Sequence, residues 1–194
     1  MTKPSDEFPE IEHAMFGGSN TAWTNYDEEK FEEVFLNNMA KEEGTELHEL
    51  AAINIKKCRK LVGKDTLALY VNDAIGFKMI PEKRLFYSKY FGGTADAISF
   101  KTNRNKDSGY KYILRIHDLK TGKIPAHMRQ LETYAAFFFL VYGIKPEETE
   151  IELRIYQNND IVVARPTAKD IKPIMNKTVM FNNMIQKLKS ELEG

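Results

Sequence analysis

The sequence predicts an α/β fold in which helices flank one mixed central β-sheet. Two observations carry this prediction: three strand-like segments follow one another between residues 82 and 119, and helical patterns precede and follow them. The chain has 194 residues, of which 42% are hydrophobic and 29% are charged. This size and composition are typical of a single globular domain with a sizeable core, and they argue against a disordered chain.

The first part of the chain is predicted to be helical after an irregular start. Residues 1–20 contain a Gly-Gly-Ser segment, which is typical of a loop. From Asp27 onwards, apolar residues recur at helical spacing behind a group of acidic residues that favours a helix start. Gly44 and Thr45 interrupt this pattern, and Thr45 can cap a second helix that is expected to run to about Leu61.

A third helix and the first three strands come next. Asp65 and Thr66 form a cap signal, and the helix that they open is expected to end at Gly76. Because the connections between the following strands are short, these strands are expected to form an antiparallel meander. Their predicted ranges are 82–87, 90–101 and 110–119.

The last part of the chain alternates helix, strands and helix. Pro125 suits the first turn of a helix that carries three consecutive phenylalanines and ends at Gly143. Two strands, over residues 150–157 and 161–164, are predicted around an asparagine-rich turn. An amphipathic helix over residues 167–194 closes the chain.

Charge is distributed unevenly, although the formal net charge is zero. Residues 1–50 contain 13 Asp or Glu against 3 Lys or Arg, and residues 101–129 contain 8 Lys or Arg against 2 Asp. A basic segment of this kind is where a polyanion such as nucleic acid would approach. Basic residues are also common in exposed turns, so a solvated hairpin is an open alternative.

Cysteine content and hydropathy narrow the class of protein further. The single cysteine, Cys58, excludes an internal disulfide and any iron–sulfur cluster held by several cysteines. The N-terminal segment is acidic and lacks the apolar core of a signal peptide, and the longest apolar run, residues 134–142, is too short to span a bilayer. We therefore expect a cytoplasmic protein with no membrane partner.

The segment from residue 113 to residue 134 contains the first candidate site. Asp118 and Lys120 are two residues apart near the end of a predicted strand, so their side chains point to the same face. Metal-assisted phosphodiester hydrolysis needs a carboxylate that holds a divalent cation and an amine that orients the attacking water. Gln130 and Tyr134 are four residues apart on the following helix, so both can point back at this site.

Two residues elsewhere are candidates for the same site. Asp96 lies on the preceding strand among small residues, where a partly buried carboxylate is expected to be paired or metal-bound. If the two strands pair, Asp96 and Asp118 can both reach one cation, and such an oxygen site suits Mg²⁺. His48 shares a helical face with Ala52 and Ile55, so it is expected to point inward, and its nitrogen would make Mn²⁺ more competitive.

Each of these residues also has a purely structural interpretation. A histidine such as His48 is more often a core residue than a metal ligand. Asp96 can pair with a lysine, and Lys120 can be a solvated strand end. Gln130 and Tyr134 can simply pack their helix. Their joint occurrence at the places that one sheet-and-helix site requires favours the functional interpretation.

Four motifs resemble those of the PD-(D/E)XK nuclease superfamily, in the order in which that superfamily has them. They are GTELHELA (44–51), GGTADAISF (92–100), IHDLKTGK (116–123) and QLETY (130–134). The sequence is most similar to the RecB-like and lambda-exonuclease-like branch, in particular to small phage-encoded nucleases, over residues 23–166. The resemblance implies a restriction-endonuclease-like core and one nuclease domain over residues 1–194.

The resemblance also implies roles for individual residues. The ligands that it implies for a metal ion are the side chains of three residues and one backbone carbonyl: His48, Asp96, Asp118 and Leu119. The residues for which it implies catalytic roles are Asp96, Asp118, Lys120, Gln130 and Tyr134. Glu82, at the start of the first predicted strand, is ranked below these.

Three basic residues near these motifs are candidate phosphate contacts: Arg115, Lys123 and Arg129. They are chosen only because they are basic and close in sequence to Asp118 and Gln130.

The function that the resemblance implies is a deoxyribonuclease that depends on one or two Mg²⁺ or Mn²⁺ ions and has no iron–sulfur cluster. An exonuclease is favoured over a sequence-specific endonuclease. The resemblance also implies a role in phage or bacterial DNA recombination, a homo-oligomeric state and a partner protein in recombination or replication. If the gene is a phage gene, the expected location is the host cytoplasm. The alternative is a catalytically silent accessory module that binds nucleic acid or protein on the same fold.

Overall fold

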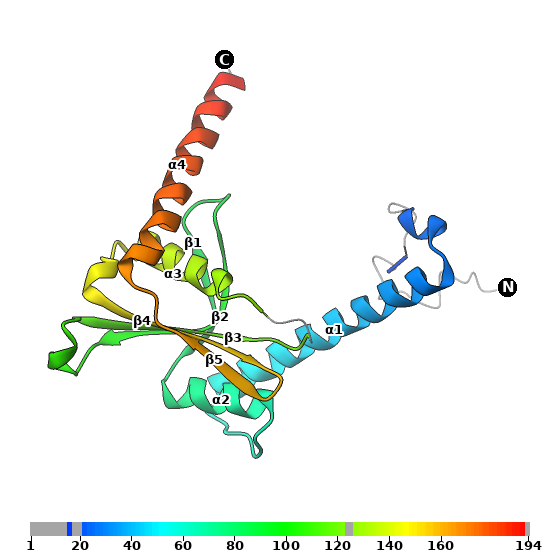
Figure 1. Cartoon of the computed structure of the whole chain (residues 1–194), viewed down its shortest axis with the longest axis horizontal. Helices are drawn as coiled ribbons and strands as arrows, with labels where there is room; N and C mark the ends of the chain where they lie inside the picture. Colours follow the sequence, from blue (N-terminus) through cyan, green and yellow to red (C-terminus); the bar gives the residue numbers. More distant parts are fainter. Residues whose placement is uncertain (1–14, 17–20, 123–125, 193–194) are drawn as a thin grey trace. The chain divides into compact units, whose positions relative to one another are not determined.

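The computed structural model describes residues 15–16, 21–122 and 126–192 (Figure 1). Contacts within the chain divide it into two units, residues 1–45 and 46–194. The α/β fold class is confirmed, because helices flank a five-stranded mixed sheet in the second unit. The expectation of one domain over the whole chain stays a prediction, and Pro125 and most of the predicted irregular start lie outside the described residues.

The first unit contains the short 3-10 helix η2 (Ala22–Asn25) and the first part of helix α1 (Glu28–Lys56). Helix α1 starts where the sequence predicts, because the Asp27 carboxylate accepts a hydrogen bond of 2.8 Å from the backbone N–H of Lys30. The rings of Phe16 and Phe31 stack with their centroids 4.6 Å apart.

Helix α1 continues through Gly44 and Thr45, so the prediction of two separate helices is wrong. The Thr45 hydroxyl donates a hydrogen bond of 3.0 Å to the carbonyl of Lys41, one turn earlier, which places Thr45 inside the helix rather than at a cap. A glycine in a helix interior costs only about 1 kcal/mol, and the good helix formers on either side can offset this cost.

The end of α1 also differs from the prediction, since the helix stops at Lys56 and not near Leu61. Cys58 adopts a left-handed φ of 51°, and the N–H of Arg59 donates a 2.9 Å hydrogen bond to the carbonyl of Asn54. This is the hydrogen-bond pattern of a C-terminal helix cap, which usually places glycine in the left-handed position. The missing glycine explains why the sequence signal was weak.

The remaining elements follow the predicted order. Helix α2 (Thr66–Gly76) is capped as predicted, because the Asp65 carboxylate accepts a 2.9 Å hydrogen bond from the N–H of Ala68. The elements after α2 are β1 (Ile80–Phe86), β2 (Gly92–Thr102), η3 (Lys106–Ser108), β3 (Tyr112–Leu119), α3 (Arg129–Tyr142), η4 (Pro146–Glu148), β4 (Thr149–Gln157), β5 (Asp160–Ala164) and α4 (Ala168–Leu192).

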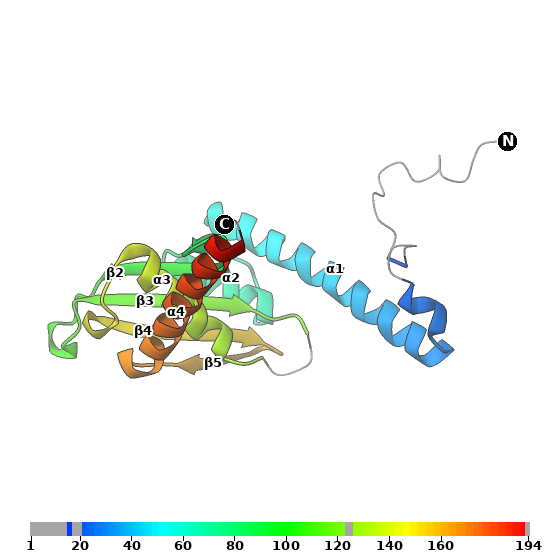
Figure 2. The ribbon, with the colours of Figure 1, turned by 90° about the horizontal axis from the view of Figure 1, so that it is seen from above.

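The sheet has the strand order β1-β2-β3-β4-β5, so strands that follow one another in the chain are neighbours in space (Figure 2). The pairs β1–β2, β2–β3 and β4–β5 are antiparallel, which confirms the predicted meander. Strands β3 and β4 are parallel, and helix α3 forms the connection between them, as a parallel pair requires.

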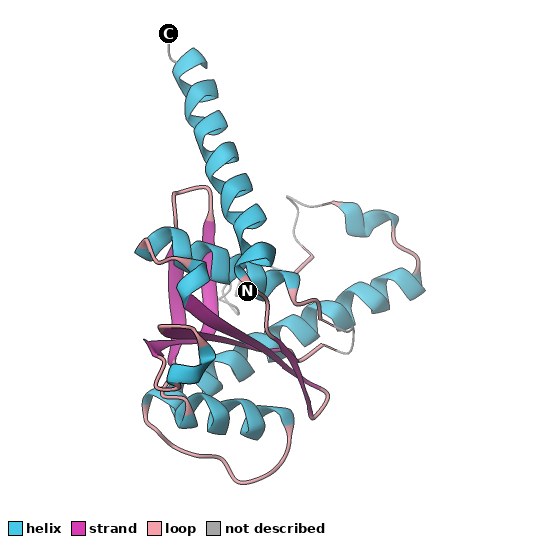
Figure 3. Cartoon of the chain, turned by 60° about the vertical axis from the view of Figure 1, so that its left-hand side comes forward, coloured by secondary structure: helices cyan, strands magenta, loops and turns pink. Residues whose placement is uncertain are grey.

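Helices cover both faces of the sheet (Figures 1 and 3). Helix α3 lies on one face, and the first turns of α4 pack against α3, so that Leu131, Phe139 and Ile171 are in one buried cluster with Leu114 and Ile116 of the central strand. Helix α2 and the C-terminal part of α1 lie on the other face, over a second buried cluster that includes residues 70, 71 and 74. The sheet is therefore a rigid platform, and its strand ends can hold side chains in fixed positions.

Candidate metal centre

Strand register places three carboxylates at matching positions on three neighbouring strands. Between β1 and β2, Pro81 lies opposite Ala97 and Lys83 lies opposite Ala95, so Glu82 and Asp96 occupy opposing positions. Such neighbouring positions on adjacent strands are about 5 Å apart.

The row of carboxylates continues onto β3. Because Ala97 lies opposite His117, the next opposing pair along the same two strands is Asp96 and Asp118. The predicted pairing of these two strands is confirmed, and it brings both carboxylates to the same end of the sheet. Three negative charges in one row repel one another unless a cation or a proton offsets them.

His48 joins this row from helix α1. Its Nδ1 atom lies 3.3 Å from Oδ2 of Asp96, and one ligand atom each of His48, Glu82 and Asp96 fall within 4.8 Å of one another. The hydrogen bond to Asp96 raises the pKa of His48 and outweighs the effect of partial burial, which acts in the opposite direction. The prediction that His48 points inward is thus confirmed, with Ala52 and Ile55 of the same helical face buried.

Asp96 is also held by the backbone of the neighbouring strand. Its Oδ2 atom accepts a 2.9 Å hydrogen bond from the N–H of Leu119. The Leu119 side chain is buried, so the end of β3 is fixed next to the carboxylate. The proposed role of the Leu119 carbonyl as a metal ligand stays a prediction.

Asp118 is the most deeply buried carboxylate of the site, with 1% of the residue exposed. Burial, together with repulsion from Asp96, raises the pKa of Asp118 to about 6, although Lys120 acts in the opposite direction. Its Oδ1 atom is buried and accepts no hydrogen bond from the described residues. An unsatisfied buried carboxylate oxygen is costly, and a bound cation would remove that cost.

Lys120 links Asp118 to helix α3. Its Nζ atom lies 3.0 Å from Oδ2 of Asp118 and donates a 3.0 Å hydrogen bond to Oε1 of Gln130. The Gln130 amide in turn donates to the Tyr134 hydroxyl at 3.3 Å. The structure therefore brings together all four residues that the sequence predicts for this segment, as one chain of contacts from the strand to the helix.

Gly93 makes room for the end of this chain. A Cβ atom at position 93 would lie only 2.8 Å from Cε1 of Tyr134, closer than unbonded carbon atoms approach. The absence of a side chain at Gly93 thus lets the Tyr134 ring pack directly against β2.

Glu82 is the member of the site that sequence reasoning ranked too low. It adopts φ of 52°, a left-handed conformation that is uncommon for residues other than glycine, in the middle of β1. Burial and repulsion from Asp96 raise its pKa. Strained backbone of this kind often occurs at functional sites. The available sequence signal was an acidic residue at the start of a predicted strand, which is common and not specific.

The candidate phosphate contacts lie in different surroundings. Arg115 pairs with Glu152 at 3.1 Å and stacks on the ring of Phe77, on the α2 side of the sheet. Arg129 is exposed at the start of α3 and pairs with Glu132 at 3.1 Å. Lys123 lies outside the described residues. Contact of these residues with DNA stays a prediction.

His117 faces away from the site. Its Nδ1 atom lies 3.1 Å from the hydroxyl of Tyr156, which donates a 2.7 Å hydrogen bond to Asp73. Burial, and to a smaller extent the nearby Arg154 and Arg115, lowers the pKa of His117 to about 3. A neutral imidazole in the core fits the structural interpretation of this residue.

The donor set of the site suits a hard divalent cation. Glu82 and Asp96 have carboxylate oxygens, which Mg²⁺ prefers, and the imidazole nitrogen of His48 favours Mn²⁺ in addition. Asp118 is the next carboxylate in the row, although it is not in the group whose ligand atoms lie within 4.8 Å of one another. A thiolate site is excluded among the described residues, because the one cysteine, Cys58, is exposed and stands alone.

No helix in the described part of the chain has the length and hydropathy that a membrane crossing requires.

The chain has no significant match among protein-family models, curated proteins or solved structures. The functional assignment therefore rests on the residues of the site and on their geometry.

Proposed function

We propose that this chain is a metal-dependent deoxyribonuclease, and that it acts as an exonuclease. The observation that carries the proposal is the placement of Lys120 between a buried acid and a helix-borne amide. Asp118 continues a row formed by Asp96 and Glu82. The ammonium group of Lys120 contacts Asp118 and also donates a hydrogen bond to Gln130. A structural ion pair alone has no need for two further carboxylates beside it.

The side chains have distinct roles in this proposal. Glu82, Asp96, Asp118 and His48 would hold one or two Mg²⁺ or Mn²⁺ ions. When bound, such an ion supplies a Lewis acid that polarises the phosphodiester and makes a water molecule more acidic. Burial at the sheet end keeps these ligands in place before the substrate arrives.

Lys120 is the group that would act on the nucleophile and the substrate. Its ammonium group is 3.0 Å from the Asp118 carboxylate, close enough to orient a water beside that carboxylate. Its positive charge also offsets the negative charge that develops on the phosphate in the transition state. Gln130, whose amide donates a hydrogen bond to Tyr134, would hold the ammonium group in position, and both residues would be close enough to contact the DNA backbone.

A cleavage assay tests the proposal. Purified protein is incubated with linear and with closed circular DNA in Mg²⁺, in Mn²⁺ and in EDTA. We expect degradation of the linear DNA only, and only with a metal ion. Cleavage of circular DNA would replace the exonuclease by an endonuclease. Binding of DNA in EDTA without cleavage in any metal would favour the accessory module instead.

Matched variants separate the site from general charge effects. Asp118→Asn and Lys120→Met should each lower the cleavage rate by at least about a hundredfold, as expected when a group that acts in the transition state is lost. Glu191→Gln and Lys187→Met make the same chemical changes in an exposed ion pair on α4 and should leave the rate unchanged. Full activity of the Lys120→Met variant would refute the assignment.

Metal binding can be measured without catalysis. Titration calorimetry with Mn²⁺ should show weaker binding to the His48→Ala and Glu82→Gln variants than to the wild type. Unchanged affinity in either variant would remove that residue from the site. A cytoplasmic location, a homo-oligomer and a partner in recombination or replication belong to the same proposal and are not needed for these tests.

A further inference from the structure

The second unit contains an open cavity of about 820 Å³ that is separate from the metal centre. It lies where the C-terminal end of α2 approaches the β2–β3 hairpin, and Gly76, Lys101 and Arg115 are among its lining residues. Lys101 is five residues after Asp96 on β2, which corresponds to about 17 Å along an extended strand.

The cavity is lined by cationic side chains. Four of its lining residues are basic, and no aspartate or glutamate is among them in the described part of the chain: the four are Lys78, Lys101, Arg104 and Arg115. Lys78 and Arg104 are exposed, so their charged groups are available to a ligand in solution. A concave surface with charges of one sign concentrates the field inside it.

Lys101 has no carboxylate partner among the residues that the structure describes. Its ammonium group donates a hydrogen bond to the carbonyl of Phe77 at the end of α2, so it is fixed at the cavity wall. Partial burial, and repulsion by Arg115 and Lys78, lower its pKa. A bound anion would reverse that repulsion.

The ion pair of Arg115 does not balance the local charge. Its partner Glu152 is buried and also pairs with Arg154 and Arg165, so one carboxylate serves three guanidinium groups. Asp73 adds one further negative charge through Arg154. Three guanidinium groups and two carboxylates leave this group of residues with an excess positive charge, next to the lysines of the cavity.

We propose that this cavity binds a phosphate group. Phosphate fits because its several oxygens can accept hydrogen bonds from Lys78, Lys101 and Arg104 at the same time, and guanidinium and ammonium groups are the side chains that recognise it. The ligand is either a free phosphate monoester or a phosphate of a polynucleotide, and it binds without a metal ion and without cleavage.

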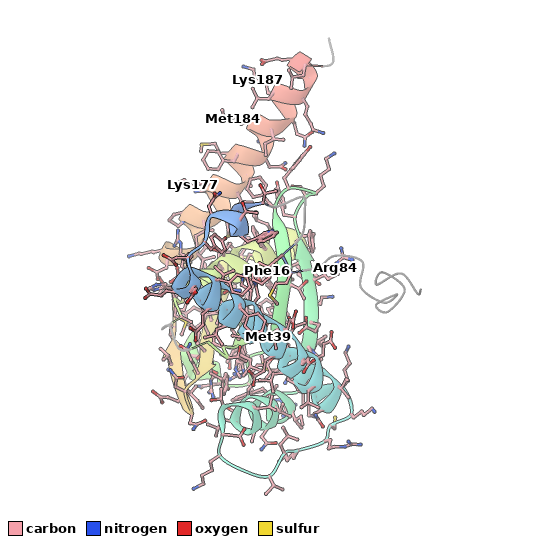
Figure 4. The ribbon with its side chains drawn as sticks, turned by 90° about the vertical axis from the view of Figure 1, so that its right-hand side faces the viewer. Phe16, Met39, Arg84, Lys177, Met184 and Lys187 are labelled. Carbon is pink, nitrogen blue, oxygen red and sulfur yellow. The ribbon has the colours of Figure 1, made fainter. Side chains whose placement is uncertain are left out.

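Binding is tested in EDTA, so that the metal centre plays no part. The probes are inorganic phosphate, a nucleoside monophosphate and a short single-stranded DNA oligonucleotide, each titrated at two salt concentrations by calorimetry or anisotropy. The cavity variant is Lys78→Gln with Arg104→Gln. The matched control is Arg84→Gln with Lys187→Gln. It removes one arginine on β1 and one lysine on α4, both labelled in Figure 4, and neither lines the cavity.

The expected result is that the wild type binds at least one probe, that the cavity variant binds it at least about tenfold more weakly, and that the control stays within about twofold. A nucleoside monophosphate that competes with the oligonucleotide would identify a phosphate monoester as sufficient, and an oligonucleotide that binds alone would identify the DNA backbone. Both results support the proposal.

Three results would overturn the proposal: no binding of any probe, equal binding by the cavity variant and the wild type, or loss of binding in Asp118→Asn. The last result would place the phosphate at the metal centre. Because Lys78 and Arg104 are exposed, their replacement should leave the melting temperature unchanged, and each single variant serves as a repeat if the double variant is unstable. Absence of cleavage would refute the nuclease and leave this binding result standing.

Discussion

Replacing Asp118 by asparagine should make the metal-free protein more stable while it lowers the cleavage rate. Asp118 is 1% exposed, its Oδ1 atom accepts no hydrogen bond from the described residues, and its neighbour Asp96 carries the same charge. Asparagine has nearly the same shape and no charge. The variant therefore removes the repulsion between the carboxylates of Asp118 and Asp96. Residues that serve function often lower stability in this way.

The magnitude follows from the pKa of Asp118. A value of about 6 in the folded protein, compared with the ordinary 3.8, corresponds to about 3 kcal/mol by which folding favours the neutral carboxyl group. The attraction of Lys120 is already included in this value, because it opposes the upward shift of the pKa. We expect Asp118→Asn to raise the free energy of unfolding by about 1–3 kcal/mol at pH 7.5 in EDTA.

The pH dependence of stability is an independent check on the sign of the change in the free energy of unfolding. The folded wild type binds a proton at Asp118 more tightly than the unfolded chain does, so wild-type stability rises as the pH falls through 6. By pH 5 about half of the cost is relieved, and the difference in stability between variant and wild type narrows by the same amount. Groups far from Asp118 titrate alike in both proteins and cancel in the difference, whereas His48, whose pKa is raised by the charge of Asp118, does not.

Urea unfolding in EDTA at pH 7.5 and at pH 5 measures both quantities, with Asp107→Asn as a control at an exposed position of the β2–β3 turn. Adding Mg²⁺ should stabilise the wild type and the control but leave Asp118→Asn unchanged. A variant that is less stable than the wild type at pH 7.5, with a gap that does not change with pH, would refute the reasoning.

Three further predictions concern the core and the site wall. Gly93→Ala should lower the free energy of unfolding by about 1–3 kcal/mol, because its Cβ would lie 2.8 Å from the Tyr134 ring. Gly76→Ala is the matched control: its Cβ would meet no atom within 4 Å, so it should raise the free energy of unfolding by about 0.5–1 kcal/mol in the same urea titration. Leu131→Ala should cost about 2–5 kcal/mol, because Leu131 is fully buried between α3 and the sheet; a smaller loss would mean that the cavity collapses. His117, with a pKa of about 3, is neutral in the folded protein, so the wild type should lose about 3 kcal/mol more than a His117→Asn variant between pH 6.5 and pH 4; parallel pH profiles would contradict this.

The parts of the fold that follow from local patterns could be predicted from the sequence. The meander was expected because short polar turns separate three strand-like segments, and the structure has β1, β2 and β3 in that arrangement. The pairing of Asp96 with Asp118 followed from the meander, and the inward direction of His48 followed from helical spacing. These inferences need only the two periods of regular secondary structure.

The errors arise where a weak local signal competes with a longer element. Gly44 and Thr45 resemble a helix boundary, but their cost is small compared with the stability of a helix that continues for several turns on both sides. The same holds at the other end, where Cys58 accepts a left-handed conformation without being a glycine. Local propensity is a weak guide wherever tertiary packing decides.

The position of some candidate residues depends on partners far away in the chain. Glu82 belongs to the site because of its register with Asp96, which no nearby residue specifies. Arg115 was selected for its charge, yet it is three residues before Asp118 on one strand and so faces the opposite side. Strand alternation alone could have shown that Arg115 does not line the metal centre.

The row of Glu82, Asp96 and Asp118 makes the site depend on backbone register and not on loop length. Longer turns between β1 and β2, or between β2 and β3, would leave the three carboxylates in line. Deleting a single residue inside β2 would instead turn Asp96 to the other face and separate it from both neighbours. Insertions, tags or whole domains should therefore be tolerated at the two hairpin tips. An insertion or deletion of a single residue within a strand should be the change of chain length that damages the site most.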